Sequence, residues 1–251
     1  MKAPSRSVVI GLFGLCVGLA ALNVYQCGRL EQASARPSST EIMRLFYEEW
    51  TPLNKPTVWQ NKWLSIPTLQ NPMDVWITQE ILQEVRPDFI VEAGTFHGGS
   101  AALFATVLDQ INPQGRIISI DIEDKAQEAK KLPIVQRKVD FLIGSSVDSR
   151  IVDDVKRRVG SGKVLVILDS LHTKEHVLSE LKAYAPIVSV GSYLIVQDTF
   201  VNGHPAMPDY GPGPWEAVQA FLSTSNDYVV DKSRERMMFT FSPDGWLKRV
   251  R

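Results

Sequence analysis

The sequence predicts an α/β fold, with a mostly parallel sheet of seven strands and helices on both faces. From residue 74 onward, short apolar runs alternate regularly with segments of helical periodicity. The run KVLVILDS, residues 163–170, is almost wholly apolar, as expected of a strand that is covered on both faces. Strands that alternate with helices in this way favour a parallel sheet.

The elements can be assigned in order along the chain. Asp74, after Pro72, is a candidate N-cap for the first helix of the alternation. Helices are expected over residues 41–50, 74–85, 98–111, 149–160 and 174–189, with another that starts near Pro214. Strands are expected over residues 88–93, 116–122, 138–144, 163–170 and 191–199, followed by a terminal pair over 228–232 and 236–243.

Length and composition limit the class of protein. A chain of 251 residues with 44% hydrophobic residues is long enough for one globular domain and an appendage. A net charge of −1, without a basic stripe, argues against a nucleic-acid partner. Only Cys16 and Cys27 are present, so the main domain has no disulfide framework and no cysteine metal site.

The N-terminal segment predicts a membrane anchor. Residues 8–25 carry no charge, follow Lys2 and Arg6, and are just long enough to cross a bilayer. A cleaved signal peptide is the alternative, although small residues are missing where cleavage needs them. We therefore expect a single-pass membrane protein, with the side of the membrane left open. The expected domains are an anchor (1–30), a linker with a helix (31–56) and a catalytic domain (57–251).

The stretch DFIVEAGTFHGGSAAL, residues 88–103, joins a strand to a helix through a glycine-rich turn. Such turns let a ligand approach the backbone and the helix N-terminus closely. The Gly-x-Gly-x-x-Gly dinucleotide fingerprint is not met, because Gly94 is followed by Gly98 and Gly99. Glu92 suits a cationic ligand group, and Asp121, after the next strand, suits ribose hydroxyls. An amino acid joined to a nucleoside describes S-adenosylmethionine (SAM).

The motif VEAGTFHGGS resembles motif I of class I SAM-dependent methyltransferases, in the form found in catechol O-methyltransferases. More closely, residues 57–250 resemble the cephalosporin hydroxylase family, which includes rhamnosyl O-methyltransferases. Long stretches carry the resemblance, namely NPMDVWITQEI, RPDFIVEAGTFHGGSAALFA, ILDSLHTKEHVLSELKAYAPIVSVGSYLIVQDT and VNGHPAMPDYGPGPWEAV. It implies a Rossmann-like methyltransferase sandwich, SAM as cofactor and O-methylation of a sugar, glycolipid or other small hydroxyl compound.

The resemblance also implies the roles of particular residues. Those expected to bind the cofactor are Glu92, Gly94, Thr95, Gly98, Ser100, Asp121, Gly144 and Ser146. For Glu92 and Asp121 the alternative is an acid that merely ends a strand.

Acids at two further strand ends suggest a metal site. Asp169 and Asp198, with Gln197, are the expected ligands of Mg²⁺, which would lower the pKa of the acceptor hydroxyl. The family tends to have Glu-Asp where this chain has Gln197-Asp198. His172 and Asp169 are the candidate catalytic residues, and His172 is the candidate general base. The alternative for His172 is a helix cap, and His176 is expected to be structural.

The loop TFVNGHPAMPDYGPGPWEAV follows the fifth strand and is long enough to suggest a function. Asn202, His204, Tyr210 and Trp215 are expected to line the acceptor pocket, the alternative being a surface flap. Two other readings stay open for the whole protein. One is a different reaction on the same scaffold, such as hydroxylation, and the other is a non-catalytic module that binds SAM or a glycan. The sequence does not indicate the oligomeric state.

Overall fold

The computed structural model describes residues 36–51 and 57–251. The chain divides into two units between Ile42 and Met43. Of the first unit, the described residues are 36–42, where the helix α2 (Ser39–Trp50) begins. The second unit, residues 43–251, contains the sheet and the candidate site.

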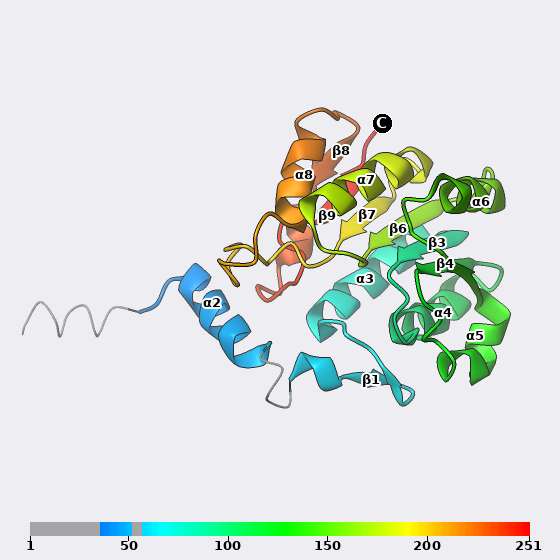
Figure 1. Ribbon diagram of the computed structural model, residues 1–251, viewed down its shortest axis with the longest axis horizontal. Coiled ribbons are helices and arrows are strands. Elements are labelled where there is room, and N and C mark those ends of the chain that lie inside the picture. Colours follow the sequence, from blue (N-terminus) through cyan, green and yellow to red (C-terminus); the bar gives the residue numbers. More distant parts are fainter. Residues whose placement is uncertain (1–35, 52–56) are drawn as a thin grey trace, which may run out of the picture. The chain divides into compact units, whose positions relative to one another are not determined.

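The second unit alternates helices and strands from α3 onward (Figure 1). Its helices are α3 (Pro72–Val85), α4 (Gly99–Ile111), α5 (Pro133–Lys138), α6 (Ser149–Val159), α7 (Lys174–Tyr184) and α8 (Pro214–Leu222), with 3-10 helices η1 (Val58–Gln60), η2 (Ala129–Lys131), η3 (Ala185–Ile187) and η4 (Lys232–Glu235). Its strands are β1 (Lys62–Trp63), β2 (Ile66–Pro67), β3 (Phe89–Ala93), β4 (Arg116–Asp121), β5 (Val139–Ile143), β6 (Val164–Leu168), β7 (Tyr193–Val196), β8 (Tyr228–Val230) and β9 (Trp246–Arg249).

Seven strands form one sheet in the order β5-β4-β3-β6-β7-β9-β8. Neighbouring strands from β5 to β7 are parallel, whereas β9 is antiparallel to both β7 and β8. The order reverses at β3, from which the chain first builds outward to β5 and then returns to add β6. Ligands of such sheets bind beyond the carboxyl ends of the strands next to this point. The predicted sheet of seven mostly parallel strands is confirmed.

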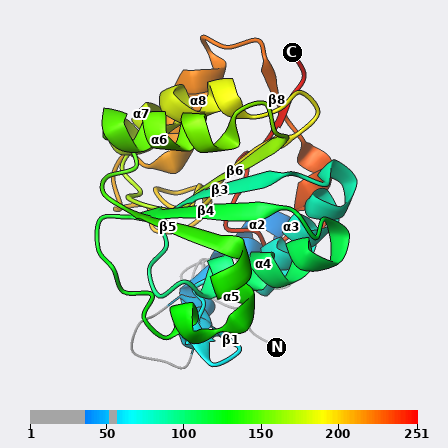
Figure 2. The ribbon, with the colours of Figure 1, turned by 90° about the vertical axis from the view of Figure 1, so that its right-hand side faces the viewer.

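Helices cover both faces of the sheet, as predicted. Figure 2 shows α6, α7 and α8 on one face and α3, α4 and α5 on the other. Alternate residues of each strand enter the two cores: in β3, Val91 and Ala93 pack toward α6 and α7, whereas Ile90 packs toward α3 and α4. Glu92 follows Ile90 by two residues and therefore lies on the α4 face.

The helix starts follow local chemistry. Asn71 caps α3 by accepting a hydrogen bond from Met73 N (3.0 Å), and Pro72 occupies the first turn. The predicted cap, Asp74, is instead buried, and its Oδ2 accepts from Phe241 N at 2.7 Å. The helix thus begins two residues earlier than expected.

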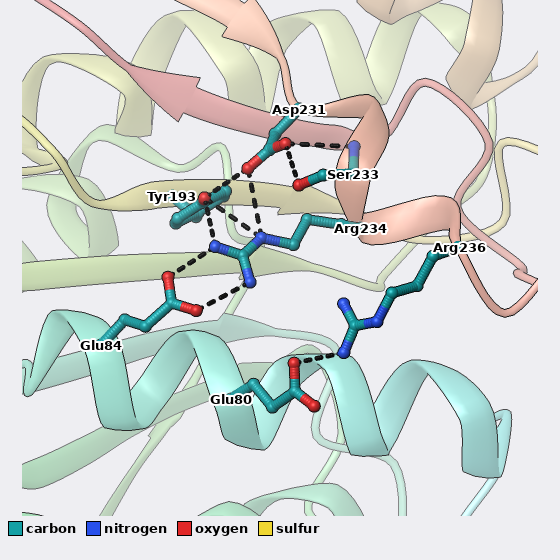
Figure 3. A network of polar contacts seen from close by, with 7 residues as sticks. All are labelled: Glu80, Glu84, Tyr193, Asp231, Ser233, Arg234 and Arg236. Atoms are coloured by element: carbon teal, nitrogen blue, oxygen red, sulfur yellow. Dashed lines mark hydrogen bonds and ion pairs between the residues drawn. The ribbon is translucent and has the colours of Figure 1, made fainter.

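A polar clasp joins η4 to α3 and β7 (Figure 3). Arg234 donates to both carboxylate oxygens of Glu84 (2.9 and 2.5 Å), and its Nε donates to Asp231 Oδ2 (3.1 Å). Tyr193 Oη donates to the same Asp231 oxygen at 2.6 Å. Beside the clasp, Arg236 pairs with Glu80. These contacts fix the segment that leads into β9.

The last strand differs from the prediction. Residues 236–243 do not join the sheet, and the place of the predicted strand is taken by β9, after a turn at Pro243 and Asp244. The alternation of Phe239 and Phe241 with polar residues serves aromatic packing, because Phe239 contacts Phe46 and Phe241 stacks on Phe200.

The predicted membrane localisation is corrected. Within residues 36–51 and 57–251, no helix is both long and apolar enough to cross a membrane. The predicted anchor, residues 8–25, lies outside the described residues.

Candidate active site

A cavity of about 550 Å³ opens at the carboxyl ends of the parallel strands. The turns after β3, β4, β5, β6 and β7 all contribute to its wall, together with residues 67–70 from the segment before α3. Sequence-predicted residues in the lining are Gly94, Thr95, Ser100, Asp121, Gly144, Ser146, Asp169, His172 and Asp198. The sheet topology thus brings together strand ends that are up to about a hundred residues apart in the sequence.

The turn after β3 requires glycine for two physical reasons. Gly94 has φ +104°, and a Cβ there would lie 1.9 Å from Asp169 O. A Cβ on Gly99 would lie 2.1 Å from Thr68 Oγ1. Gly98 caps α4 at φ +79° and does not line the cavity. The glycines let β3, β6 and the segment 67–70 pack closely, so that the N-terminus of α4 faces the cavity.

Glu92 lies behind the cavity wall. Its carboxylate is buried and accepts a hydrogen bond from Ser119 Oγ at 2.5 Å. Burial raises the pKa of Glu92 to about 7, against the lowering effect of hydrogen bonds from Ser100 and Ser119. Glu92 is absent from the lining, and it is linked to the cavity through Ser100 and, by way of Ser119, through Thr95.

Asp121 lines the cavity and is held in place by backbone donors. Its Oδ2 accepts from Phe96 N at 2.7 Å and its Oδ1 accepts from Glu123 N at 3.2 Å. On the neighbouring strand, Gly144 N donates to Asp121 O (2.8 Å) and brings Ser146 to the same edge. A fixed carboxylate of this kind can accept hydrogen bonds from a diol.

Asp169, His172 and Asp198 form a cluster whose ligand atoms lie within 4.8 Å of one another. His172 lies between the carboxylates, with Nδ1 3.1 Å from Asp198 Oδ2 and Nε2 3.4 Å from Asp169 Oδ1. Asp198, two residues after the end of β7, reaches this position through a left-handed backbone (φ +56°). Gln70, which sequence reasoning missed, donates to Asp169 Oδ2 at 2.8 Å.

The charges of this cluster favour a cation. Burial lowers the pKa of His172, but Asp198 and Asp169 outweigh it and raise that pKa to about 9. His172 Nε2 is also buried without a hydrogen bond of good geometry to any described residue. Two carboxylates with an unsatisfied imidazole nitrogen between them fit a divalent cation, for which the carboxylate oxygens suit Mg²⁺.

Gln197 is not part of this cluster, contrary to prediction. Successive strand residues point to opposite faces, and Gln197 follows Ile195 onto the α3 side of the sheet. There its Oε1 accepts from Ser242 Oγ at 3.3 Å, and it does not line the cavity. The third member of the cluster is His172 instead of Gln197.

The loop after β7 is organised around Glu216 instead of the cavity. Asn202 Nδ2 donates to Glu216 Oε1 (2.6 Å), and His204 Nε2 lies 3.2 Å from the same oxygen. His204 stacks on Trp215, whose Nε1 donates to Asp244. None of the four predicted acceptor residues, namely Asn202, His204, Tyr210 and Trp215, lines the cavity. Partial burial, and then the charge of Asp198, raise the pKa of Tyr210.

Sequence reasoning also missed the apolar rim of the cavity. Phe96, Ile122 and Leu171 line it while 41%, 68% and 56% of their surfaces are exposed. Each lies one or two residues after a predicted residue, namely Thr95, Asp121 or Asp169, so this position in the sequence could have indicated them. His176, expected to be structural, lines the cavity as well.

Comparisons with known proteins agree on one family. Residues 56–250 match the family model for rhamnosyl O-methyltransferase/CmcI. A curated rhamnosyl O-methyltransferase of Mycobacterium tuberculosis (strain ATCC 25618 / H37Rv) is 36% identical over 248 residues, which cover 96% of this chain and 94% of the relative. One from Mycobacterium leprae is 36% identical over 198 residues, covering 76% of this chain and 85% of the relative.

Solved structures share the fold at lower identity. A CmcI structure with Mg and SAM has a TM-score of 0.61 and 18% identity, with 87% of this chain and 86% of the other covered. The O-methyltransferase TomG from Streptomyces achromogenes has a TM-score of 0.52 and 17% identity, with 83% and 86% covered. The family inferred from the motifs is thus confirmed, and this chain belongs to the rhamnosyl O-methyltransferase/CmcI family.

Proposed function

We propose that this protein is a SAM-dependent O-methyltransferase that acts on a sugar hydroxyl with the help of Mg²⁺. The observation that carries the proposal is the cluster Asp169–His172–Asp198 in the wall of a cavity built on the glycine turn after β3. Membership of a family whose curated relatives are named rhamnosyl O-methyltransferases supports it, as does the likeness in fold to a structure that contains Mg and SAM.

The cofactor would bind across the strand ends. Thr95 and Ser100, at the N-terminus of α4, suit its amino-acid end, and Glu92 fixes Ser100 from behind. Asp121 suits the ribose diol because its carboxylate is oriented by two backbone donors. Gly144 and Ser146 lie on the next strand outward and suit the base.

Residues of this chain would have different roles in catalysis. When bound, SAM supplies an electrophilic methyl group and the divalent cation lowers the pKa of the acceptor hydroxyl. Asp169 and Asp198 would hold the cation, and Gln70 orients Asp169. His172 holds a proton while both carboxylates face it, so it can take the acceptor's proton only when their charge is neutralised. Phe96, Ile122 and Leu171, which line the cavity, would shield the transfer from water once the ligands are bound.

The acceptor would enter between the cluster and the loop after β7. Glu216 keeps this loop ordered through Asn202 and His204, so these two residues shape the acceptor site from behind. Tyr210 is the loop residue that we expect to contact the sugar. Its side chain is exposed, and the charge of Asp198 is one of the causes that raise its pKa. The position of the methylated hydroxyl would follow from this contact.

Titration calorimetry with SAM tests cofactor binding. We expect Asp121→Asn to weaken binding by about 10- to 100-fold, because it replaces a charged acceptor of the ribose hydroxyls. Asp124→Asn is the matched control, since Asp124 lies three residues further on and pairs with Lys130 at the surface. Equal affinities of wild type and Asp121→Asn would remove Asp121 from the site, and no binding by folded wild type would overturn the proposed function.

A further inference from the structure

A second polar cluster lies in the cavity wall, apart from the acidic cluster of Asp169, His172 and Asp198. Helix α7 carries His176, Glu180 and Tyr184 at intervals of four residues, so that one face of the helix presents all three. Glu180 is completely buried, and its Oε2 finds no hydrogen-bond partner among the residues that the structure describes. A buried carboxylate is costly to desolvate, so its position here calls for a functional explanation.

Two serine hydroxyls from different strand ends converge on this carboxylate. Ser146 Oγ, after β5, donates to Glu180 Oε1 at 2.5 Å, and Ser170 Oγ, after β6, donates to the same oxygen at 2.6 Å. His176 Nε2 lies 3.2 Å from Ser146 Oγ and 3.3 Å from Glu180 Oε1. Tyr184 Oη donates to Ser146 O at 2.6 Å and fixes the backbone.

This arrangement sets the polarity of the cavity wall. A carboxylate only accepts hydrogen bonds, so the protons of both hydroxyls point toward Glu180 and away from the ligand. His176 Nε2 faces acceptors alone and therefore carries the ring proton. Ser146 and Ser170 line the cavity, and both are left with oxygen lone pairs for a ligand. The cavity wall therefore presents hydrogen-bond acceptors and is complementary to a ligand group that donates hydrogen bonds.

The strand order indicates which part of the cofactor meets this wall. Along the sheet edge, Asp198 and Asp169 follow β7 and β6, Asp121 follows β4, and Ser146 follows the outermost strand β5. A ligand with its reacting end at the acidic cluster and its diol at Asp121 has its base beside Ser146. The base is therefore the part that must supply the donor.

We propose that Glu180 is a specificity-determining residue that orients Ser146, Ser170 and His176 so that the site accepts a base with an exocyclic amino group and rejects an oxo base. The inference rests on the proposed function, because it assumes a nucleoside cofactor. An amino group donates to the serine lone pairs, whereas the carbonyl of an oxo base places a third acceptor against them. Leaving buried acceptors unpaired is how a site rejects an analogue strongly.

The test compares two ligands that differ at this one group. Calorimetry measures the binding of S-adenosylhomocysteine and S-inosylhomocysteine to the full chain. Wild type should favour the adenosyl ligand by about 10- to 100-fold. In Glu180→Gln the amide can donate to a serine and turn its proton toward the cavity, so the preference should fall to about threefold or less. Glu175→Gln is the matched control, since it removes the same charge from an exposed position of α7.

A second variant keeps the test decisive if Glu180→Gln unfolds. Ser170→Ala leaves Glu180 with Ser146 and His176, removes one acceptor from the wall and should also lower the preference. A wild-type protein that binds both ligands equally would overturn this inference alone. The inference would also be overturned if folded Glu180→Gln kept the wild-type preference for the adenosyl ligand. If Glu180→Gln does not fold, the same preference in Ser170→Ala would overturn it. Failure of wild type to bind either ligand would overturn the proposed function with it.

Discussion

Burial can change the pKa of a single carboxyl group strongly, and Asp74 of α3 is an example. Asp74 is 1% exposed, and burial raises its pKa to about 7, against the lowering effect of hydrogen bonds from Thr240 and Phe241 N. It ties α3 to the segment that precedes β9. Because its role depends on tertiary burial, the sequence pattern alone gave it the different role of a helix cap.

Replacing Asp74 with Asn should change the pH dependence of stability. The folded pKa of about 7 exceeds the ordinary value of 3.8, so the folded state binds the proton more tightly. The contribution of Asp74 is therefore fully present below about pH 4 and is lost as pH rises through about 7. Asp74→Asn, which keeps the acceptor for Phe241 N, should unfold with a free energy above that of wild type at pH 8, by about a few kcal/mol at most.

Urea denaturation at pH 5 and pH 8 measures this difference. Asp153→Asn, at an exposed position of α6, is the control and should behave as wild type at both pH values. If Asp74→Asn were less stable than wild type at pH 8, the carboxylate would be the stabilising form, contrary to this prediction.

At the scale of elements, the clasp between η4 and α3 fixes the segment that precedes β9. Only 9% of the Arg234 side chain is exposed, and it joins Glu84, Asp231 and Tyr193. The clasp links residues 150 positions apart, and no local pattern in the sequence indicates such a pairing. The same is true of Phe239 and Phe241, whose alternation predicted a strand although they pack on aromatic side chains.

Breaking the clasp should destabilise the protein. Arg234→Met leaves Asp231 and Tyr193 without their charged partner, and we expect a loss of about 2–4 kcal/mol in the free energy of unfolding. The matched control is Arg236→Met, whose pair with Glu80 is more exposed and should contribute about 1 kcal/mol or less. Chemical denaturation of both variants gives the comparison, and equal losses would contradict the central place of Arg234.

At the scale of the whole molecule, the fold was largely predictable and the site was predictable in part. The alternation of apolar runs and helical periods determines a parallel sheet, and a parallel sheet gathers its carboxyl ends at one edge. Asp121, Asp169 and Asp198 were found by this rule. Gln197 was misassigned because its neighbour Asp198 leaves the strand through a left-handed turn, while Gln197 stays on the α3 face.

Long-range packing accounts for the remaining differences. Gln70 and the Glu180 cluster enter the site from segments that the strand-end rule does not consider. The loop after β7 has the predicted position, but its polar residues satisfy Glu216 instead of facing the cavity. Contacts of this kind depend on side chains that are distant in sequence, and one sequence does not contain the information to pair them.

We infer that this chain transfers a methyl group from SAM to a sugar hydroxyl, with Asp169 and Asp198 of the acidic cluster holding the metal. The most direct measurement is mass spectrometry of a rhamnosyl glycoside after incubation with the full chain, SAM and Mg²⁺. We expect a gain of one CH₂ per acceptor, abolished by EDTA, restored by added Mg²⁺ and reduced about 100-fold or more in Asp198→Asn. Methyl transfer that is unaffected by EDTA and by Asp198→Asn would contradict the metal site, and a gain of one oxygen would contradict the methyltransferase itself.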